Sequence, residues 1–379
     1  MLRGLNWGHR RASGPMNALS AVAREKLGFE LVWEQQSLNG FEHGLTAQIA
    51  NRYDLVIFDH PFCGDIVTDN LLHPLTDWLR EVDANCFIGG SLESYRMANE
   101  LWGLPIDGAT QACVYRSDLM SDEKIPVNWD EVLQLGRRLR RKGQWLVLPS
   151  LSPHGFLLLL AMCAALGDPW PVEPTIEVPV TTVKNAIQAL LEVSELAHPA
   201  GIGWNAIDVH DAMTKGNELV YCPAMYVYTT YSEKDHRAPL SFAPFPGPNG
   251  TPNGTVLGGT GLGVTRSCES LSEAMRLVTF LASAEVQTNL IMKNHGQPAR
   301  REAWEGCEAD ELFSGSHAKL RRTMETTWTR PRFPGYIAWQ ASCGKLFESL
   351  LTGNLSEAAF FSGLIGSWEN LENTRRART

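Results

Sequence analysis

Gly103-Leu-Pro-Ile-Asp-Gly-Ala-Thr-Gln-Ala-Cys-Val-Tyr-Arg-Ser-Asp-Leu-Met120 is the stretch of sequence that indicates how the chain is divided. Leu104 precedes a proline, which pushes its backbone out of the helical region and predicts an extended entry. The run from Ala112 to Tyr115 is short and apolar, as in buried strands. We therefore expect a strand that leaves one lobe of the protein and enters another.

The composition is that of an ordinary globular protein. The chain has 379 residues, of which 44% are hydrophobic and 20% charged, so it is neither disordered nor fibrous. This length allows two or three domains, each with a sizeable core. The net charge of −9 disfavours a nucleic-acid partner, because binding a polyanion requires a clustered basic surface.

The beginning of the sequence bears on localisation. The first nine residues, Met1 to His9, lack the apolar core of a secretory signal. No apolar run reaches the roughly 18 residues of a membrane span, so we expect no membrane insertion. Eight cysteines are scattered singly without metal-ligand spacing. As written, the sequence predicts a cytoplasmic monomer without a metal, or a periplasmic protein if a leader has been removed.

Strands and helices alternate in the first part of the sequence. We expect strands at 2–7, 29–33 and 53–58, a loop over 8–16, and helices over 17–26 and 41–51. Such alternation predicts an α/β lobe with parallel strands, whose ligands bind beyond the carboxyl ends of the strands. Trp7, His9, Asp59 and His60 occupy two of those ends.

Several segments resemble the bacterial extracellular solute-binding proteins, the carbohydrate-type family that serves ABC importers. The segments that carry the resemblance are Trp7-Gly-His9, Leu71–Asp77, Gly103–Leu119, Asn128-Trp-Asp-Glu131, Leu257–Val264 and Gly296–Arg300. The resemblance implies a two-lobed, type II periplasmic-binding-protein-like α/β fold with hinge crossovers and a ligand cleft between the lobes. It also implies lobe 1 over residues 1–111 and 258–310, lobe 2 over 112–257, and a helical tail over 311–379 that belongs mostly to lobe 2.

The resemblance and the strand ends together suggest a set of ligand-binding residues. An aromatic plate with several hydrogen-bonding groups suits a small polar ligand. The candidates are Trp7, His9, Asp59, His60, Asp107, Gln111, Tyr226, Tyr228 and Thr260.

Cys113 leaves a second class of function open. A lone buried cysteine is usually an inert small hydrophobe. The two-lobed scaffold is, however, similar to that of thiaminase I, in which a cleft cysteine is the nucleophile. In that reading Cys113 would need a base such as Asp107 or His60 to form its thiolate.

The sequence thus predicts a protein that closes on a sugar or related organic compound, with no cofactor and with ABC permease subunits as possible partners. The glycine-rich segment Gly258–Gly263 lacks the spacing and the following helix of a dinucleotide loop. The alternative is a cytoplasmic enzyme on the same scaffold, using acid–base or cysteine chemistry.

Overall fold

The computed structural model describes residues 1–250, 254–306 and 311–376. The chain forms two compact units. Unit 1 comprises residues 1–109, 257–318 and 332–334, and unit 2 comprises residues 110–256, 319–331 and 335–379. We expected the chain to cross between the lobes after residues 111 and 257. The two units are divided after residues 109 and 256. The expected tail boundary at 310 lies before the observed one at 318.

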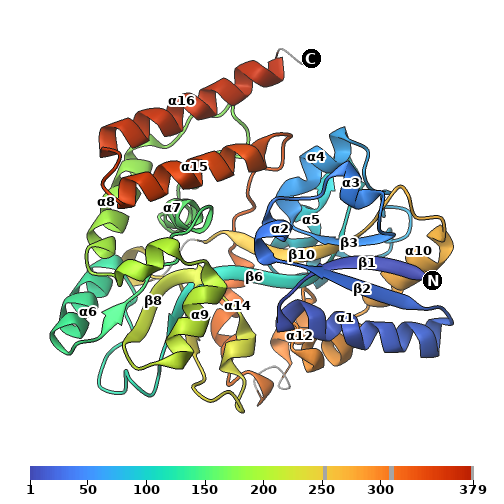
Figure 1. Cartoon of the computed structure of the whole chain (residues 1–379), viewed down its shortest axis with the longest axis horizontal. Helices are drawn as coiled ribbons and strands as arrows, with labels where there is room; N and C mark the ends of the chain where they lie inside the picture. The colour runs from blue at the N-terminus through green and yellow to red at the C-terminus, as the bar shows by residue number, and fades with distance from the viewer. Residues whose placement is uncertain (251–253, 307–310, 377–379) are drawn as a thin grey trace. The chain divides into compact units, whose positions relative to one another are not determined.

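Unit 1 is built on a mixed sheet with the strand order β2-β1-β3-β10-β6. Strands β1, β2 and β3 run parallel, and β10 pairs antiparallel with β3. Helix α1 lies on one side of these strands and α2 and α4 lie on the other (Figure 1). The strands of unit 1 are β1 (Leu2–Trp7), β2 (Leu31–Gln36), β3 (Leu55–Phe58), β4 (Arg96–Met97), β5 (Glu100–Leu101), β10 (Leu257–Val264) and the first half of β6 (Leu104–Tyr115).

The helices of unit 1 are mostly short. They are α1 (Arg10–Val22), α2 (Leu38–Glu42), α3 (Ala47–Ala50), α4 (Cys63–Thr68), α5 (Ser91–Ser94), α10 (Leu271–Leu281), α11 (Ala284–Val286) and α12 (Arg301–Glu305). The described residues of unit 1 also form two π-helical turns, η1 (Ala23–Leu27) after α1 and η8 (Gln287–Ile291) after α11.

The expected loop over residues 8–16 is wrong, because α1 begins at Arg10. His9 caps the helix, its Nδ1 accepting a hydrogen bond from the Arg11 amide at 3.1 Å. Pro15 lies inside the helix although it lacks the amide hydrogen of an ordinary residue. The expected helix over 41–51 is also replaced by two short helices, α2 and α3, on either side of Gly44, which has a positive φ of 92°.

Gly259 lets β10 lie close to β6. Its φ is +104°, and a Cβ atom built there would lie 2.1 Å from the carbonyl oxygen of Asp107. Both the backbone angle and the close approach require glycine. The glycine-rich segment therefore serves strand packing within unit 1.

In unit 2 the sheet continues from the second half of β6 through β8 (Leu219–Tyr226), β7 (Trp145–Leu146) and β9 (Ser241–Ala243). The second half of β6 pairs antiparallel with β8 and β9, and β8 pairs parallel with β7. The helices wholly in unit 2 are α6 (Trp129–Arg141), α7 (His154–Ala165), α8 (Val180–Ser194), α9 (Ala206–Lys215), α15 (Tyr336–Leu351) and α16 (Glu357–Arg376), and α14 (Ser316–Glu325) runs from unit 1 into unit 2.

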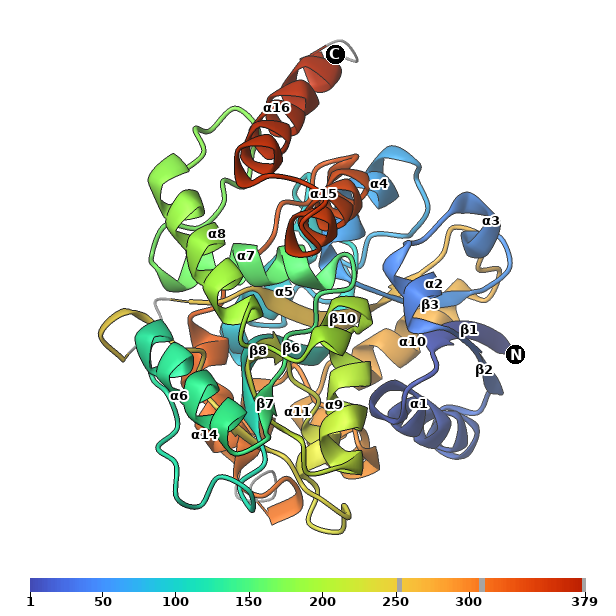
Figure 2. The same cartoon turned by 60° about the vertical axis from the view of Figure 1, so that its left-hand side comes forward.

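The apolar helix α7 forms the centre of a helical layer in unit 2. Every residue of α7 is buried, and α15 packs against it with α16 beyond (Figure 2). Trp170, Trp339 and Trp368 form a buried cluster whose ring centroids lie 4.7–5.5 Å apart. Aromatic rings at this spacing fix the tail helices onto unit 2.

Candidate functional site

The carboxyl ends of β1 and β3 place four of the expected residues in unit 1. Trp7 is the last residue of β1 and is 4% exposed, with its ring 5.1 Å from that of Phe41. Its indole Nε1 has no hydrogen-bond partner among the described residues. Because a buried indole N–H usually finds an acceptor, this donor is available to another group. His9 follows as the cap of α1, so its Nδ1 is occupied within the protein.

Asp59 and His60 lie directly after β3. The imidazole Nδ1 of His60 lies 3.1 Å from a carboxylate oxygen of Asp59. His60 is almost wholly buried, and its ring meets that of Tyr95 edge-on at 6.1 Å. The Asp59 side chain is the more exposed of the two. Its carboxylate is therefore partly accessible to solvent, while its contact with the His60 imidazole fixes its position.

Asp107 forms a buried ion pair with Arg11. The guanidinium donates from Nε to one carboxylate oxygen at 2.7 Å and from a terminal nitrogen to the other. Both side chains are nearly inaccessible to solvent. Burial raises the pKa of Asp107, whereas the charge and hydrogen bonds of Arg11 oppose that shift. We expected Asp107 to accept hydrogen bonds from a ligand. In the structure, Arg11 of α1 donates a hydrogen bond to each of its carboxylate oxygens.

Three of the expected residues meet around one small cavity. Trp7, Asp107 and Thr260 line it together with Asn6 and Arg11. Its volume is about 10 Å³, room for roughly one water molecule. Asn6 Nδ2 and Thr260 Oγ1 are buried without a hydrogen-bond partner among the described residues. Within unit 1 these residues therefore form a polar cluster, and the cavity that they line is much smaller than a sugar.

Arg11 and Asn6 are the residues of this cluster that the sequence did not single out. Arg11 lies in the segment that we expected to be a loop, and its partner Asp107 lies 96 residues away in the sequence. Asn6 is an inward-facing residue of a strand, 1% exposed, whose Oδ1 accepts from the Trp7 amide at 2.8 Å. A polar residue among apolar neighbours in a buried strand is the one signal that could have indicated Asn6.

Gln111, Tyr226 and Tyr228 belong to unit 2. Gln111 on β6 stands directly opposite Tyr226 on β8, so the two side chains share one face of the sheet. Gln111 is 1% exposed, and its Oε1 has no partner among the described residues. Tyr228 is buried with its ring 5.5 Å from that of His210.

The surroundings of Cys113 are those of an inert thiol. Cys113 is fully buried, and burial raises its pKa to about 12, with the Tyr221 hydroxyl only partly opposing the shift. A nucleophilic cysteine requires the opposite, a lowered pKa and partial exposure. Asp107 lies six residues away on the same strand, about 20 Å at the usual rise of ~3.3 Å per residue. This geometry favours a packing role for Cys113.

Residues 1–250, 254–306 and 311–376 contain neither a candidate metal site nor a membrane-spanning helix. No group of three or more His, Cys, Asp or Glu side chains there could hold a metal ion. None of the helices in those ranges is long and apolar enough to cross a membrane.

Solved structures with the same fold cover nearly the whole chain. MalE3 of T. maritima with bound maltose is 16% identical, with a TM-score of 0.82 over 98% of this chain and 99% of that one. An ABC transporter solute-binding protein of Agrobacterium radiobacter K84 in complex with ribitol is 17% identical, with a TM-score of 0.82 over 98% of each chain. A solute-binding protein of Thermotoga lettingae TMO with α-D-tagatose is 16% identical, with a TM-score of 0.82 over 97% and 98%.

These likenesses establish the α/β fold of the two-lobed periplasmic binding proteins. A family model, described as bacterial extracellular solute-binding protein, matches residues 16–288, which is more than half of the sequence. The chain therefore belongs to the bacterial extracellular solute-binding protein family.

Proposed function

We propose that this chain binds a small sugar or sugar alcohol as the solute-binding subunit of an ABC importer. The observation that carries the proposal is the family match over residues 16–288. The sugar and polyol ligands of the similar structures, among them maltose, ribitol and tagatose, favour this class of ligand.

The chemistry of the candidate residues supports such a ligand. Sugars present hydroxyl groups at their edges and apolar C–H faces, so they bind to aromatic rings flanked by hydrogen-bonding groups. The indole N–H of Trp7 and the amide oxygen of Gln111 have no hydrogen-bond partner in the part of the chain that the structure describes. Asp59, at the end of β3, adds a partly exposed carboxylate.

The proposed mechanism is closure of the two units on the ligand. A ligand that makes additional contacts in a closed conformation shifts the population towards that conformation. Residues of unit 1 such as Trp7 and Asp59 and residues of unit 2 such as Gln111 would then each contribute to binding. The closed, loaded monomer would be the form that permease subunits recognise.

A calorimetric screen against maltose, maltotriose, ribitol, tagatose and acarbose tests the proposal, with mass spectrometry of each solution afterwards. The expected result is saturable binding of at least one compound, which also raises the melting temperature, and recovery of that compound unchanged. Consumption of the compound would instead establish an enzyme. Absence of binding to every sugar and polyol would contradict the proposal.

Variants of Trp7 locate the site. Trp7→Ala is expected to weaken sugar binding at least tenfold, because a ring that stacks on the ligand is lost together with its N–H donor. Trp7→Phe retains a ring and is expected to bind with an intermediate affinity. Trp78→Ala is the matched control, since Trp78 is 49% exposed in the same unit and lies outside the cluster. Equal losses in Trp7→Ala and Trp78→Ala would exclude Trp7 from the site.

A further inference from the structure

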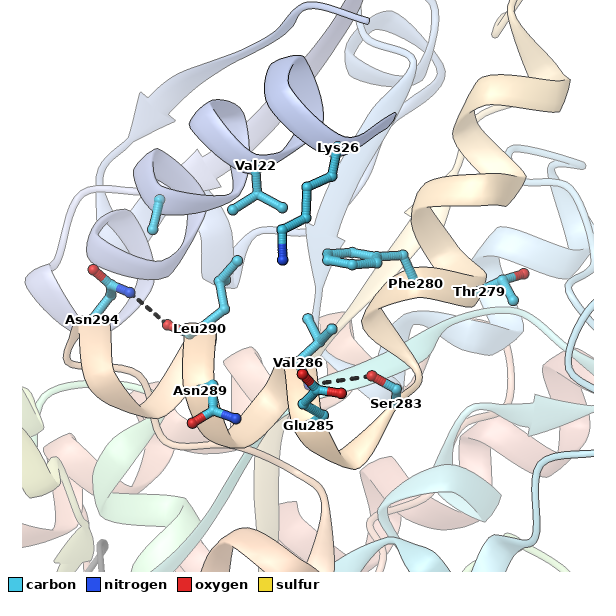
Figure 3. Close-up of a pocket in the computed structure, with 11 residues that line it drawn as sticks. Val22, Lys26, Thr279, Phe280, Ser283, Glu285, Val286, Asn289, Leu290 and Asn294 are labelled. Carbon is cyan, nitrogen blue, oxygen red and sulfur yellow. Dashed lines mark hydrogen bonds between the residues drawn. The ribbon is translucent and has the colours of Figure 1, made fainter. Parts of the chain in front are cut away.

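A larger pocket lies elsewhere in unit 1, beside α1. It is lined on one side by α1 and the π-turn η1, and on the other by the segment from the end of α10 to Asn294 (Figure 3). Its volume is about 560 Å³, within the range of roughly 300–1,000 Å³ typical of small-molecule sites. It shares no lining residue with the cavity beside Trp7.

Apolar side chains from both walls converge on this pocket. Val22 projects from α1 towards Phe280 and Leu290 on the opposite wall (Figure 3). Val22 and Phe280 are half-buried, so part of each side chain still faces the pocket. A ligand with an apolar group would remove this surface from water, worth about 25 cal/mol per Å².

Both walls carry a π-helical turn. The turn η1 contributes Lys26, and the turn η8 contributes Asn289 and Leu290. Single π-turns are rare in proteins and occur frequently at functional sites, because the additional residue displaces side chains from their regular helical positions. Their occurrence on two facing walls of one pocket is an indication of function that is independent of its volume.

The polar groups of the pocket restrict what it can bind. Thr279 Oγ1 donates to the Met275 carbonyl at 3.1 Å, and Ser283 Oγ accepts from the Val286 amide at 3.2 Å. Asn294 Nδ2 donates to the Leu290 carbonyl at 2.8 Å. Asn289 Oδ1 accepts from Lys293 Nζ at 2.8 Å. The charged side chains among the lining residues are one cation and one anion.

Lys26 and Glu285 are these two charged groups. Lys26 extends from η1 into the pocket, and Glu285 lies on the facing wall (Figure 3). Neither forms an ion pair with any residue in the described part of the chain. A simple anion would meet the repulsion of Glu285, and a simple cation that of Lys26. A zwitterion satisfies both charges.

We propose that this pocket binds a free amino acid with a large apolar side chain. Its carboxylate would pair with Lys26 and its ammonium group with Glu285, while its side chain covers Phe280, Leu290 and Val22. A sugar would leave these apolar surfaces poorly covered. The site is therefore distinct in both place and chemistry from the one proposed for sugar.

Three related compounds test the charge requirement. L-phenylalanine, 3-phenylpropanoate, which lacks the ammonium group, and 2-phenylethylamine, which lacks the carboxylate, are titrated in turn into the natural chain and followed by NMR. Since an exposed ion pair contributes up to about 1 kcal/mol, L-phenylalanine is expected to bind about fivefold more tightly than either analogue. No binding of L-phenylalanine at millimolar concentration, or equal binding of all three, would overturn the proposal.

Charge-removing variants assign the contacts. Lys26→Met is expected to weaken the binding of L-phenylalanine and 3-phenylpropanoate about fivefold and, by removing a like charge, to strengthen that of 2-phenylethylamine. Glu285→Gln should weaken the binding of L-phenylalanine and 2-phenylethylamine and strengthen that of 3-phenylpropanoate. Arg24→Met and Glu25→Gln are matched controls, because both residues are exposed on the same π-turn but do not line the pocket. Equal effects in controls and pocket variants would refute the assignment.

Sugar binding provides an independent readout for each variant. The Lys26 and Glu285 variants are expected to retain the affinity of the natural chain for any sugar that the screen identifies. If no sugar binds at all, the amino-acid titration still decides the present proposal, with circular dichroism to verify folding. The two proposals thus fail by different measurements.

Discussion

The ion pair between Arg11 and Asp107 is a residue-level feature with a large expected contribution to stability. Asp107→Asn would leave the Arg11 guanidinium buried without a counter-charge. Removing one member of a buried pair costs about 3–5 kcal/mol, so urea unfolding should show a loss of about that size. Replacing both residues, in Arg11→Met with Asp107→Leu, is expected to recover most of the loss.

Asp77→Asn is the control for this measurement. Asp77 pairs with Arg80 at 3.1 Å, but its side chain is 89% exposed. Exposed pairs contribute little to stability, so the variant should unfold at the same urea concentration as the natural chain. A loss in Asp107→Asn no larger than that in the control would show that the buried pair is replaceable by a neutral hydrogen bond.

His317 is expected to make the protein sensitive to mild acid. Its imidazole is fully buried between the rings of Trp304 and Phe313, and neither nitrogen has a hydrogen-bond partner among the described residues. Burial lowers its pKa from 6.5 to about 3. Between those two values the unfolded chain binds a proton that the folded chain does not, so stability falls as the pH falls below 6.5.

The size of this effect follows from the pKa difference. At pH 5 the cost is about 2 kcal/mol relative to pH 7, since each pH unit below 6.5 contributes about 1.4 kcal/mol. His317→Phe should reduce the pH 7 to pH 5 difference in unfolding free energy by that amount, measured with urea. His43→Gln, at an exposed position, is the control. An unchanged pH dependence in His317→Phe would contradict the assignment.

Residues that act locally were predictable from the sequence, and residues that act at long range were not. Asn128, for example, caps α6 by accepting a hydrogen bond from the Glu131 amide at 2.9 Å. The capping residue and its partner lie three positions apart, so the sequence contains the whole interaction. Arg11 could not be assigned, because a partner 96 residues away is brought close only by the completed sheet.

At the scale of elements, the positions of the first strands were predicted more accurately than their bounds. The bounds expected for β1 are those observed, since tertiary packing and local pattern agree there, whereas the strands expected at 29–33 and 53–58 are observed at Leu31–Gln36 and Leu55–Phe58. The first two turns of α1, Arg10–Met16, were missed because a sequence with Gly14 and Pro15 suggests a loop, while Arg11, in the first of these turns, pairs with Asp107. The π-turns η1 and η8, which shape the pocket beside α1, have no recognised sequence signal in this chain.

The contact between β10 and β6 leads to a prediction at this scale. Gly259→Ala would add a methyl group that collides with the Asp107 carbonyl. Gly143 is a matched control, because its φ of +72° is also positive but no atom lies within 4 Å of its added Cβ. Gly143→Ala should lose about 1–2 kcal/mol from backbone strain alone. Gly259→Ala should lose considerably more in a urea titration, and equal losses would show that β10 can move away.

At the scale of the whole molecule, the proposed closure predicts a change in size on binding. Adding the sugar identified by calorimetry should reduce the radius of gyration measured by small-angle X-ray scattering. L-phenylalanine, whose proposed pocket lies entirely within unit 1, should leave the radius unchanged. A sugar that binds without altering the scattering curve would contradict closure while leaving the binding itself intact.

The place of β10 in the sheet also governs the order in which the protein can fold. Strand β10 lies between β3 and β6, yet it follows them by more than 140 residues in the sequence. On the ribosome, β3 and the first half of β6 are therefore made long before the strand that joins them. Until Leu257–Val264 emerges, both strands have unpaired edges that can associate with other chains. Unit 2, whose segment from Thr110 to Val256 is continuous, can begin to fold first, and the N-terminal unit completes its sheet last.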